Sequence, residues 1–229
     1  MKKHYPWLWF DADGTLFDYQ RAEINALRQT FVSLALPFQD SYLDVYRRIN
    51  DELWKALERR ETTQAILRLR RFELLLEAIH LNASTDEMSS IYLEQLAMGT
   101  DLIEGAYEIL QTLSQTCQIA IVTNGITAVQ SRRFGRSTIQ PFVRELIISE
   151  EIGVAKPSPA FFEVASARTG HPPKSSVLLI GDSLTSDIRG GVDYGIDTCW
   201  FNPTGEPGPE GWAITYRVGQ LRELLEIIE

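Results

Sequence analysis

The sequence predicts an α/β fold, in which a doubly wound parallel sheet is interrupted by an inserted all-helical domain. Two observations support this prediction. Five short apolar runs have the length of buried strands, and helical patterns alternate with the later runs. Between the first run and the second stands an interval of about 80 residues that carries helical patterns and no convincing strand.

The predicted strands are continuously apolar, as expected for parallel strands that are buried on both faces. Turn-rich sequence after Gly205 predicts a loop, an edge strand and a closing helix at the end of the chain. Helices that accompany the sheet are predicted at 105–115, 128–135, 159–169 and 186–194. The predicted strands are 7–10, 119–123, 145–149, 177–181 and 198–201.

Helical periodicity dominates the inserted interval, where apolar residues recur three or four positions apart. Four helices are predicted there, at 22–34, 41–57, 63–81 and 85–98. An all-helical insert after the first strand of a parallel sheet predicts a separate cap domain. We therefore expect a Rossmann-like core domain over 1–17 and 99–229, and a helical cap domain over 18–98. Arginines of the insert, Arg70 and Arg71 among them, are interleaved with acidic residues, which predicts a solvated helix face.

The chain of 229 residues has a formal net charge of −9, which disfavours binding to nucleic-acid polymers and to anionic lipid. No apolar run approaches the roughly 18 residues of a membrane span. The two cysteines, Cys117 and Cys199, lie inside apolar runs and predict neither a disulfide framework nor a zinc site. We expect a cytoplasmic protein without a membrane or nucleic-acid partner, and no feature predicts an oligomeric state.

Polar residues end three of the predicted strands, and a lysine follows a fourth. Because the carboxyl ends of parallel strands form the ligand crevice of an open sheet, we expect these residues to converge. The set consists of Asp11, Asp13, Thr123, Asn124, Lys156, Asp182 and Asp187.

The carboxylates of this set predict a divalent cation. Asp11, Asp13 and Asp182 would repel one another and raise each other's pKa unless a cation lay among them. Hard oxygen donors without His or Cys favour Mg²⁺. The ion would also allow an acidic protein to bind an anionic phosphate group.

The same residues can transfer a phosphoryl group. An aspartate such as Asp11 can attack phosphorus as a covalent nucleophile. Asp13 lies two residues further on, on the same side of an extended chain, and can protonate a departing alkoxide and later accept a proton from water. Lys156, Thr123 and Asn124 can bind the phosphoryl oxygens.

Four ordered segments resemble the motifs of the haloacid dehalogenase-like hydrolase superfamily. The resemblance covers nearly the whole chain and implies that Asp11 is the nucleophile and Asp13 the acid and base. It implies Mg²⁺ ligation by the Asp11 side chain, the Asp13 carbonyl and Asp182. The segments are Asp11-x-Asp13-Gly14-Thr15-Leu16, Thr123-Asn124, Lys156-Pro157 and Gly181-Asp182-Ser183-Leu184-Thr185-Ser186-Asp187.

The resemblance also implies phosphate contacts for Thr123 and Lys156. Asp187 would orient a metal ligand or a metal-bound water. The helical insert resembles the C1 cap of that superfamily.

Asp13 favours a phosphatase among the reactions of the superfamily, which also includes dehalogenases, phosphonatases and mutases. A halide leaves without an acid, whereas an alkoxide needs one. A phosphonatase would require a Schiff-base lysine in the cap, where Lys55 is the only lysine. A phosphomutase remains an alternative, because it differs in how well the cap excludes water.

The motifs are further similar to those of bacterial pyrimidine 5′-nucleotidases, which often carry Asp where this chain has Gly14. That similarity implies a nucleoside 5′-monophosphate as the small phosphorylated substrate, with a sugar or polyol phosphate as the alternative. A phospho-accepting receiver module is the alternative from another class. The helical insert argues against it, because signalling needs no lid.

Overall fold

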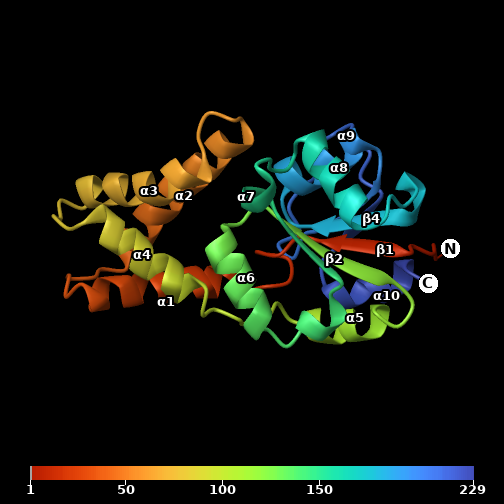
Figure 1. Ribbon diagram of the computed structural model, residues 1–229, viewed down its shortest axis with the longest axis horizontal. Coiled ribbons are helices and arrows are strands. Elements are labelled where there is room, and N and C mark those ends of the chain that lie inside the picture. The colour runs from red at the N-terminus through yellow and green to blue at the C-terminus, as the bar shows by residue number, and fades with distance from the viewer. Residues whose placement is uncertain (1) are drawn as a thin grey trace. The chain divides into compact units, whose positions relative to one another are not determined.

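Six parallel strands form one sheet in the computed structural model, which describes residues 2–229. Their order is β3-β2-β1-β4-β5-β6, so the chain runs outward from β1 in one direction and then returns to continue from β4 in the other (Figure 1). This confirms the predicted doubly wound fold, whose switch point lies between β1 and β4. The strands are β1 Trp7–Phe10, β2 Gln118–Thr123, β3 Glu145–Ile148, β4 Val177–Gly181, β5 Asp197–Phe201 and β6 Tyr216–Val218.

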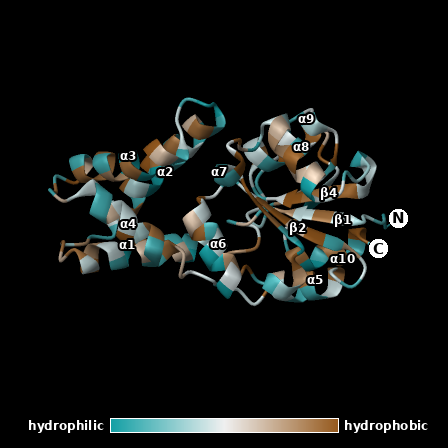
Figure 2. Ribbon diagram, viewed as in Figure 1, coloured by the Kyte–Doolittle hydropathy of each residue, from teal (hydrophilic) through white to brown (hydrophobic). Residues whose placement is uncertain are grey.

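Helices cover both faces of the sheet, and alternate side chains of β1 reach the two hydrophobic cores. Leu8 and Phe10 pack on the side of α5 and α10, whereas Trp7 and Trp9 pack on the side of α8 and α9 (Figure 1). Figure 2 shows β2 in brown, as expected for a strand buried on both faces. The helices that follow the helical insert along the chain are α5 Ala106–Leu113, α6 Thr127–Arg136, α7 Ser149–Ile152, α8 Pro159–Arg168, α9 Arg189–Tyr194 and α10 Leu224–Ile227.

Two segments of this unit differ from the sequence prediction. The strand predicted to reach Ser149 ends at Ile148, because acidic residues follow it and favour the first turn of α7. The helix predicted from residue 186 begins earlier, as a π-helical turn at Leu184–Ile188 that leads into α9. A π-helical turn has no periodicity of its own over so few residues, so the sequence does not reveal it.

Four further helices have their own interior. Side chains cap the third and fourth of them: Thr63 accepts a hydrogen bond from Ile66 N–H, and Ser84 accepts one from Glu87 N–H, both at 3.3 Å. None of the helices within residues 2–229 combines the length and the apolar character needed to cross a bilayer. The four helices are α1 Tyr19–Ser33, α2 Ser41–Glu58, α3 Gln64–Ala78 and α4 Thr85–Leu96.

The chain divides into two compact units. The first runs to Asp18 and continues over Thr100–Thr127 and Phe134–Glu229, and the second consists of Tyr19–Gly99 and Ala128–Arg133. Part of α6 therefore belongs with the helical unit, which the sequence did not indicate.

The prediction of a solvated face for the arginines of the helical insert is wrong for Arg71. Its side chain is 1% exposed, whereas that of the neighbouring Arg70 is 48% exposed. Arg71 lies four residues from both Leu67 and Leu75, which are fully buried. Residues four apart share a helix face, so Arg71 lies on the apolar side of α3.

Candidate active site

Asp11 lies at the carboxyl end of β1, in the middle of the sheet. Its backbone N–H donates to Ile180 O at 2.8 Å, which extends the pairing of β1 with β4 by one residue and fixes the position of Asp11. The chain then turns, with Gly14 N–H donating to Phe17 O at 3.0 Å. Asp13 lies in this turn, partly buried, and its main chain forms a bridge with Phe17.

Lys156 brings three segments of the chain together. Its buried Nζ donates to Asp11 Oδ1 at 2.6 Å, to Asp187 Oδ1 at 2.6 Å and to Val122 O at 2.7 Å. These bonds use all three donors of the ammonium group. The Asn124 side chain holds the backbone of Lys156, accepting from its N–H at 2.8 Å and donating to its carbonyl at 2.9 Å. Asn124 therefore acts on the site through the position of Lys156.

The buried charges perturb one another. Burial raises the pKa of Asp11 well above its usual value, and Asp187 and Asp182 add to the rise while Lys156 opposes it. Burial also raises the pKa of Asp182 to about 6, with repulsion from Asp187 as the next cause. Burial by itself would lower the pKa of Lys156, but Asp11 and Asp187 outweigh it and hold that pKa above its usual value. The cluster thus holds three carboxylates and one ammonium group, and it favours a further cation.

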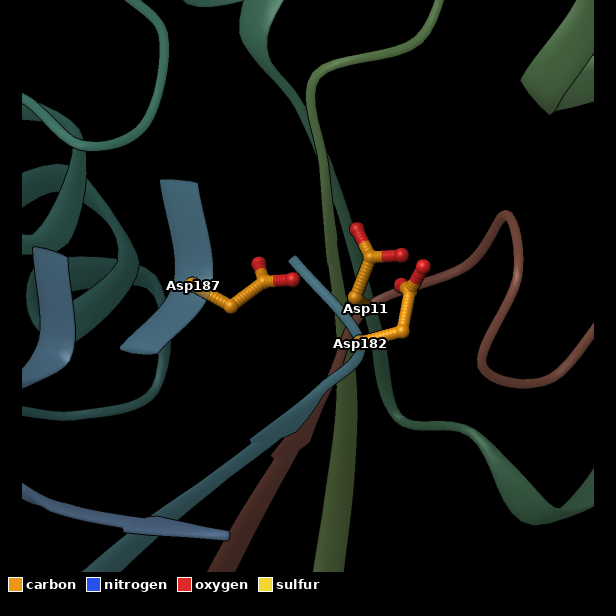
Figure 3. A group of neighbouring side chains, drawn as sticks. All are labelled: Asp11, Asp182 and Asp187. Atoms are coloured by element: carbon orange, nitrogen blue, oxygen red, sulfur yellow. The ribbon is translucent and has the colours of Figure 1, made fainter. Parts of the chain in front are cut away.

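Figure 3 shows the carboxylates of Asp11 and Asp182 close together, with that of Asp187 directed toward them from another segment. One ligand oxygen of each lies within 4.8 Å of the others. Lys156 occupies Oδ1 of Asp11, and the Thr15 hydroxyl donates to Oδ1 of Asp182 at 3.0 Å. These two bonds do not use Oδ2 of Asp11 or Oδ2 of Asp182. This donor set of hard carboxylate oxygens fits Mg²⁺.

Asp187 is already bound on both oxygens. Lys156 Nζ donates to its Oδ1, and Ser183 N–H donates to its Oδ2 at 3.2 Å. A side chain at Gly181 would overlap the carboxylate of Asp187, so the absence of a Cβ there makes room for it. Asp187 is fully buried and is placed to orient Lys156.

Thr123 is the last residue of β2 and is 1% exposed. Its hydroxyl oxygen accepts a hydrogen bond from Gly125 N–H at 3.0 Å, which leaves the hydroxyl hydrogen available to donate. The structure thus joins Asp11, Lys156 and Asp187 by direct bonds. Thr123 lies at the end of the neighbouring strand.

Two residues that support Asp182 were not identified from the sequence. Thr15 belongs to the first motif, but its bond to Asp182 depends on how the loop turns. Trp200 Nε1 donates to the main-chain oxygen of Asp182 at 3.0 Å, because the register of β4 and β5 pairs Gly181 with Trp200. The register between separate strands cannot be read from one sequence. The position of Trp200 near the carboxyl end of a predicted strand did, however, place it at the edge of the sheet where the site residues were expected.

We expect Gly14→Ala to weaken both the fold and the binding of Mg²⁺. Gly14 has a φ of +87°, and a Cβ there would lie 2.6 Å from Asp182 Oδ2. The strain and the displaced carboxylate should lower the free energy of unfolding by about 1–3 kcal/mol. Urea unfolding and calorimetric Mg²⁺ titration measure the two effects.

Gly170→Ala is the matched control for this change. Gly170 has a φ of +83°, and nothing lies within 4 Å of a Cβ built there. It should incur the backbone strain alone and leave Mg²⁺ affinity unchanged. Equal Mg²⁺ affinity in the two variants would mean that a Cβ at residue 14 does not displace the Asp182 carboxylate from its metal-binding position.

Known proteins match the chain over most of its length. Residues 8–201 match the family model described as haloacid dehalogenase-like hydrolase. The chain is 35% identical to the HAD-hydrolase YfnB of Bacillus subtilis, over 99% of this chain and 96% of the relative. A crystal structure of YfnB bound to magnesium matches with a TM-score of 0.92 over 98% of both chains.

Two relatives bear the name pyrimidine 5′-nucleotidase. YjjG of Escherichia coli is 33% identical, and the match covers 98% of each chain. PynA of Streptococcus pneumoniae is also 33% identical, over 98% of this chain and 95% of the relative.

Proposed function

Because the chain belongs to the haloacid dehalogenase-like hydrolase family, we propose that it is a Mg²⁺-dependent phosphatase that hydrolyses nucleoside 5′-monophosphates. The two pyrimidine 5′-nucleotidases support the substrate class, and pyrimidine nucleotides are therefore the first candidates. The observation that most supports the reaction is the pair of Asp11 and Asp182, each with one oxygen held and the other available, beside a buried lysine. Membership of a hydrolase family removes the receiver module as an alternative.

Asp11 is the proposed nucleophile. Lys156 holds Oδ1, so the carboxylate presents Oδ2 to the phosphorus of the substrate. A bond forms between Asp11 Oδ2 and phosphorus while the bond from phosphorus to the leaving oxygen breaks. The product of this step is an aspartyl phosphate and a nucleoside alkoxide that takes up a proton.

Asp13 is the proposed source of that proton. It protonates the leaving oxygen and then, as a carboxylate, accepts a proton from the water that attacks the phosphorus of the aspartyl phosphate. The second step regenerates Asp11 and releases inorganic phosphate. The Thr123 hydroxyl donates to a phosphoryl oxygen, and Lys156 contributes its charge and the orientation of Asp11.

Asp11, Asp182 and the main-chain carbonyl of Asp13 are the proposed ligands of Mg²⁺, with Asp11 using an oxygen lone pair that neither the bond from Lys156 nor the attack on phosphorus requires. A bound Mg²⁺ supplies positive charge that offsets the negative charge of the carboxylates and of the phosphate group. Asp187 then acts indirectly, through Lys156 and the loop at Ser183.

The helical unit is the proposed cap domain. It consists mainly of Tyr19–Gly99, an insert between β1 and the rest of the sheet unit. Such a cap limits the substrate to small phosphate esters and is expected to move during turnover.

We expect Mg²⁺ to raise the melting temperature more at about pH 7.5 than at about pH 5. The folded-state pKa of Asp182 is raised to about 6, so stability from its protonated form is present at low pH and is lost as the pH rises through about 6. Above that pH the ionised carboxylates of the metal-free protein repel one another, and bound Mg²⁺ would reduce this repulsion. Below it, protons compete with the ion. Thermal unfolding with and without Mg²⁺ at both pH values measures the difference.

Asp182→Asn should remove most of the Mg²⁺ effect at the higher pH, because the amide keeps its acceptor oxygen for Thr15 and loses the charge. Asp193→Asn is the matched control, since Asp193 is exposed and paired with Arg189. A Mg²⁺ shift of equal size at both pH values, or one that survives in Asp182→Asn, would contradict the ligand assignment.

A substrate screen with Mg²⁺ tests the proposed function. UMP, dTMP and CMP should be hydrolysed with higher kcat/KM than ribose 5-phosphate and glycerol 3-phosphate. Faster hydrolysis of the sugar and polyol phosphates would refute the nucleotide class and favour the alternative substrate class. Absence of turnover with every ester would refute the phosphatase itself.

A further inference from the structure

Arg71 is a fully buried cation inside the helical unit. It lies on α3 with 1% of its surface exposed. The guanidinium carbon lies 4.6 Å from the ring centroid of Tyr92 and 5.1 Å from that of Phe72. Contacts of this kind stabilise a cation through aromatic faces, but they do not engage the N–H bonds in the plane of the guanidinium.

The in-plane donors of Arg71 are only partly used. Nη1 donates to Asn50 Oδ1 at 3.4 Å, at the long end of the hydrogen-bond range. Nε and Nη2 have no hydrogen-bond partner within residues 2–229. These two nitrogens share one edge of the guanidinium, where two parallel N–H bonds form a fork that matches the two oxygens of a carboxylate.

The hydroxyls of two tyrosines near Arg71 are also unsatisfied. The hydroxyls of Tyr46 and Tyr92 are buried and make no hydrogen bond of normal geometry in the described part of the chain. The two rings lie 5.4 Å apart, and both pack against Phe72. Four potential donors therefore gather in one interior cluster, and buried polar groups of this kind normally have partners.

Arg71 also has no carboxylate in direct contact. Within residues 2–229, no carboxylate forms an ion pair with Arg71. The negative charge of the buried Glu23 favours the charged form of Arg71 from a distance, but the Glu23 carboxylate is bonded to Arg47, at 2.8 Å. Water molecules would satisfy the hydrogen bonds but would bring no negative charge into contact with the guanidinium.

We propose that Arg71, with the hydroxyls of Tyr46 and Tyr92, forms a binding site for a small carboxylate inside the helical unit. One carboxylate supplies both the negative charge and the pair of coplanar acceptor oxygens that the Arg71 fork requires. Its oxygens can also accept from the tyrosine hydroxyls. This site consists of residues of the helical unit alone and is independent of the Asp11 cluster.

Titration of the dialysed wild-type protein with sodium formate tests the site without relying on catalysis. Formate should raise the melting temperature along a saturating curve, because it binds the folded state. Sodium chloride at equal concentrations should have a clearly smaller effect, since a spherical ion does not match the fork. An absent formate effect, or an equal effect of chloride, would overturn the proposal.

Substitutions at Arg71 localise the effect. Arg71→Met should abolish the formate shift and should leave the formate-free protein at least as stable as the wild type, because it removes an unpaired buried charge. Arg71→Lys keeps the charge without the fork and should weaken the apparent formate affinity by about tenfold or more. Arg70→Met is the matched control, since Arg70 is exposed and paired with Glu73. A formate shift that persists in both Arg71 variants would place the binding elsewhere and refute the site.

Discussion

Asp11→Asn is expected to lower kcat for every phosphate ester by at least about 10⁴-fold, because an amide cannot serve as the attacking nucleophile. The change is nearly isosteric, and Lys156 retains its bonds to Asp187 and Val122. The loss should therefore be in kcat and in the formation of aspartyl phosphate, with little change in the fold. Steady-state kinetics with UMP and with p-nitrophenyl phosphate measure it.

Two controls separate the loss of the nucleophile from a loss of folding or of negative charge. The melting temperature of the metal-free Asp11→Asn variant should equal or exceed that of the wild type, since the substitution removes one of three crowded carboxylates. Asp193→Asn, which neutralises an exposed and paired carboxylate, should keep full activity. Residual activity of Asp11→Asn above about 1% would mean that another group attacks phosphorus.

Asp13→Asn is expected to lower kcat for UMP by about 10²–10⁴-fold, the usual contribution of a positioned acid and base. The effect should depend on the leaving group. p-Nitrophenolate departs without a proton, so the first step with p-nitrophenyl phosphate should remain fast while hydrolysis of the aspartyl phosphate slows. The variant should therefore show a burst of p-nitrophenol followed by slow turnover.

Rapid-mixing kinetics distinguish this outcome from a general loss of structure. A burst whose amplitude approaches the enzyme concentration would identify the second step as the slow one. A uniform loss with both substrates and no burst would show that Asp13 does not act as the acid and base.

The sheet was predictable because its strands carry their signal locally. The first five are short apolar runs, and the polar residues after β1, β2 and β4 mark the carboxyl ends of those strands. The order of the strands follows from few topological choices for alternating strands and helices. The π-helical turn at Leu184–Ile188 and the single turn of α7 were not predictable, since such short elements are stabilised by their surroundings.

The convergence of the candidate site residues follows from the same topology, but their contacts do not. Lys156 lies in a loop, and its bonds to Asp11 and Asp187 depend on a backbone that Asn124 holds in place. The sequence assigned Asn124 to phosphate binding because an amide at a strand end can donate there. In the folded chain that amide is occupied by the backbone of Lys156.

Arg71 illustrates a different limit. Charge interleaving along α3 predicted solvent exposure, and it describes Arg70 correctly. The spacing of apolar residues around Arg71 predicts burial instead, because Leu67 and Leu75 lie on the same helix face and are buried. Composition alone does not decide between these two patterns, and a buried arginine needs partners that only the packed helices provide.

Acid quenching during turnover, followed by peptide mapping, tests the central claim most directly. The Asp13→Asn variant mixed with p-nitrophenyl phosphate and Mg²⁺ should yield an acid-stable acyl phosphate on the peptide that contains Asp11, because its slow second step lets the intermediate accumulate. Phosphate found on another residue, or a burst of p-nitrophenol without any phosphorylated peptide, would contradict the account.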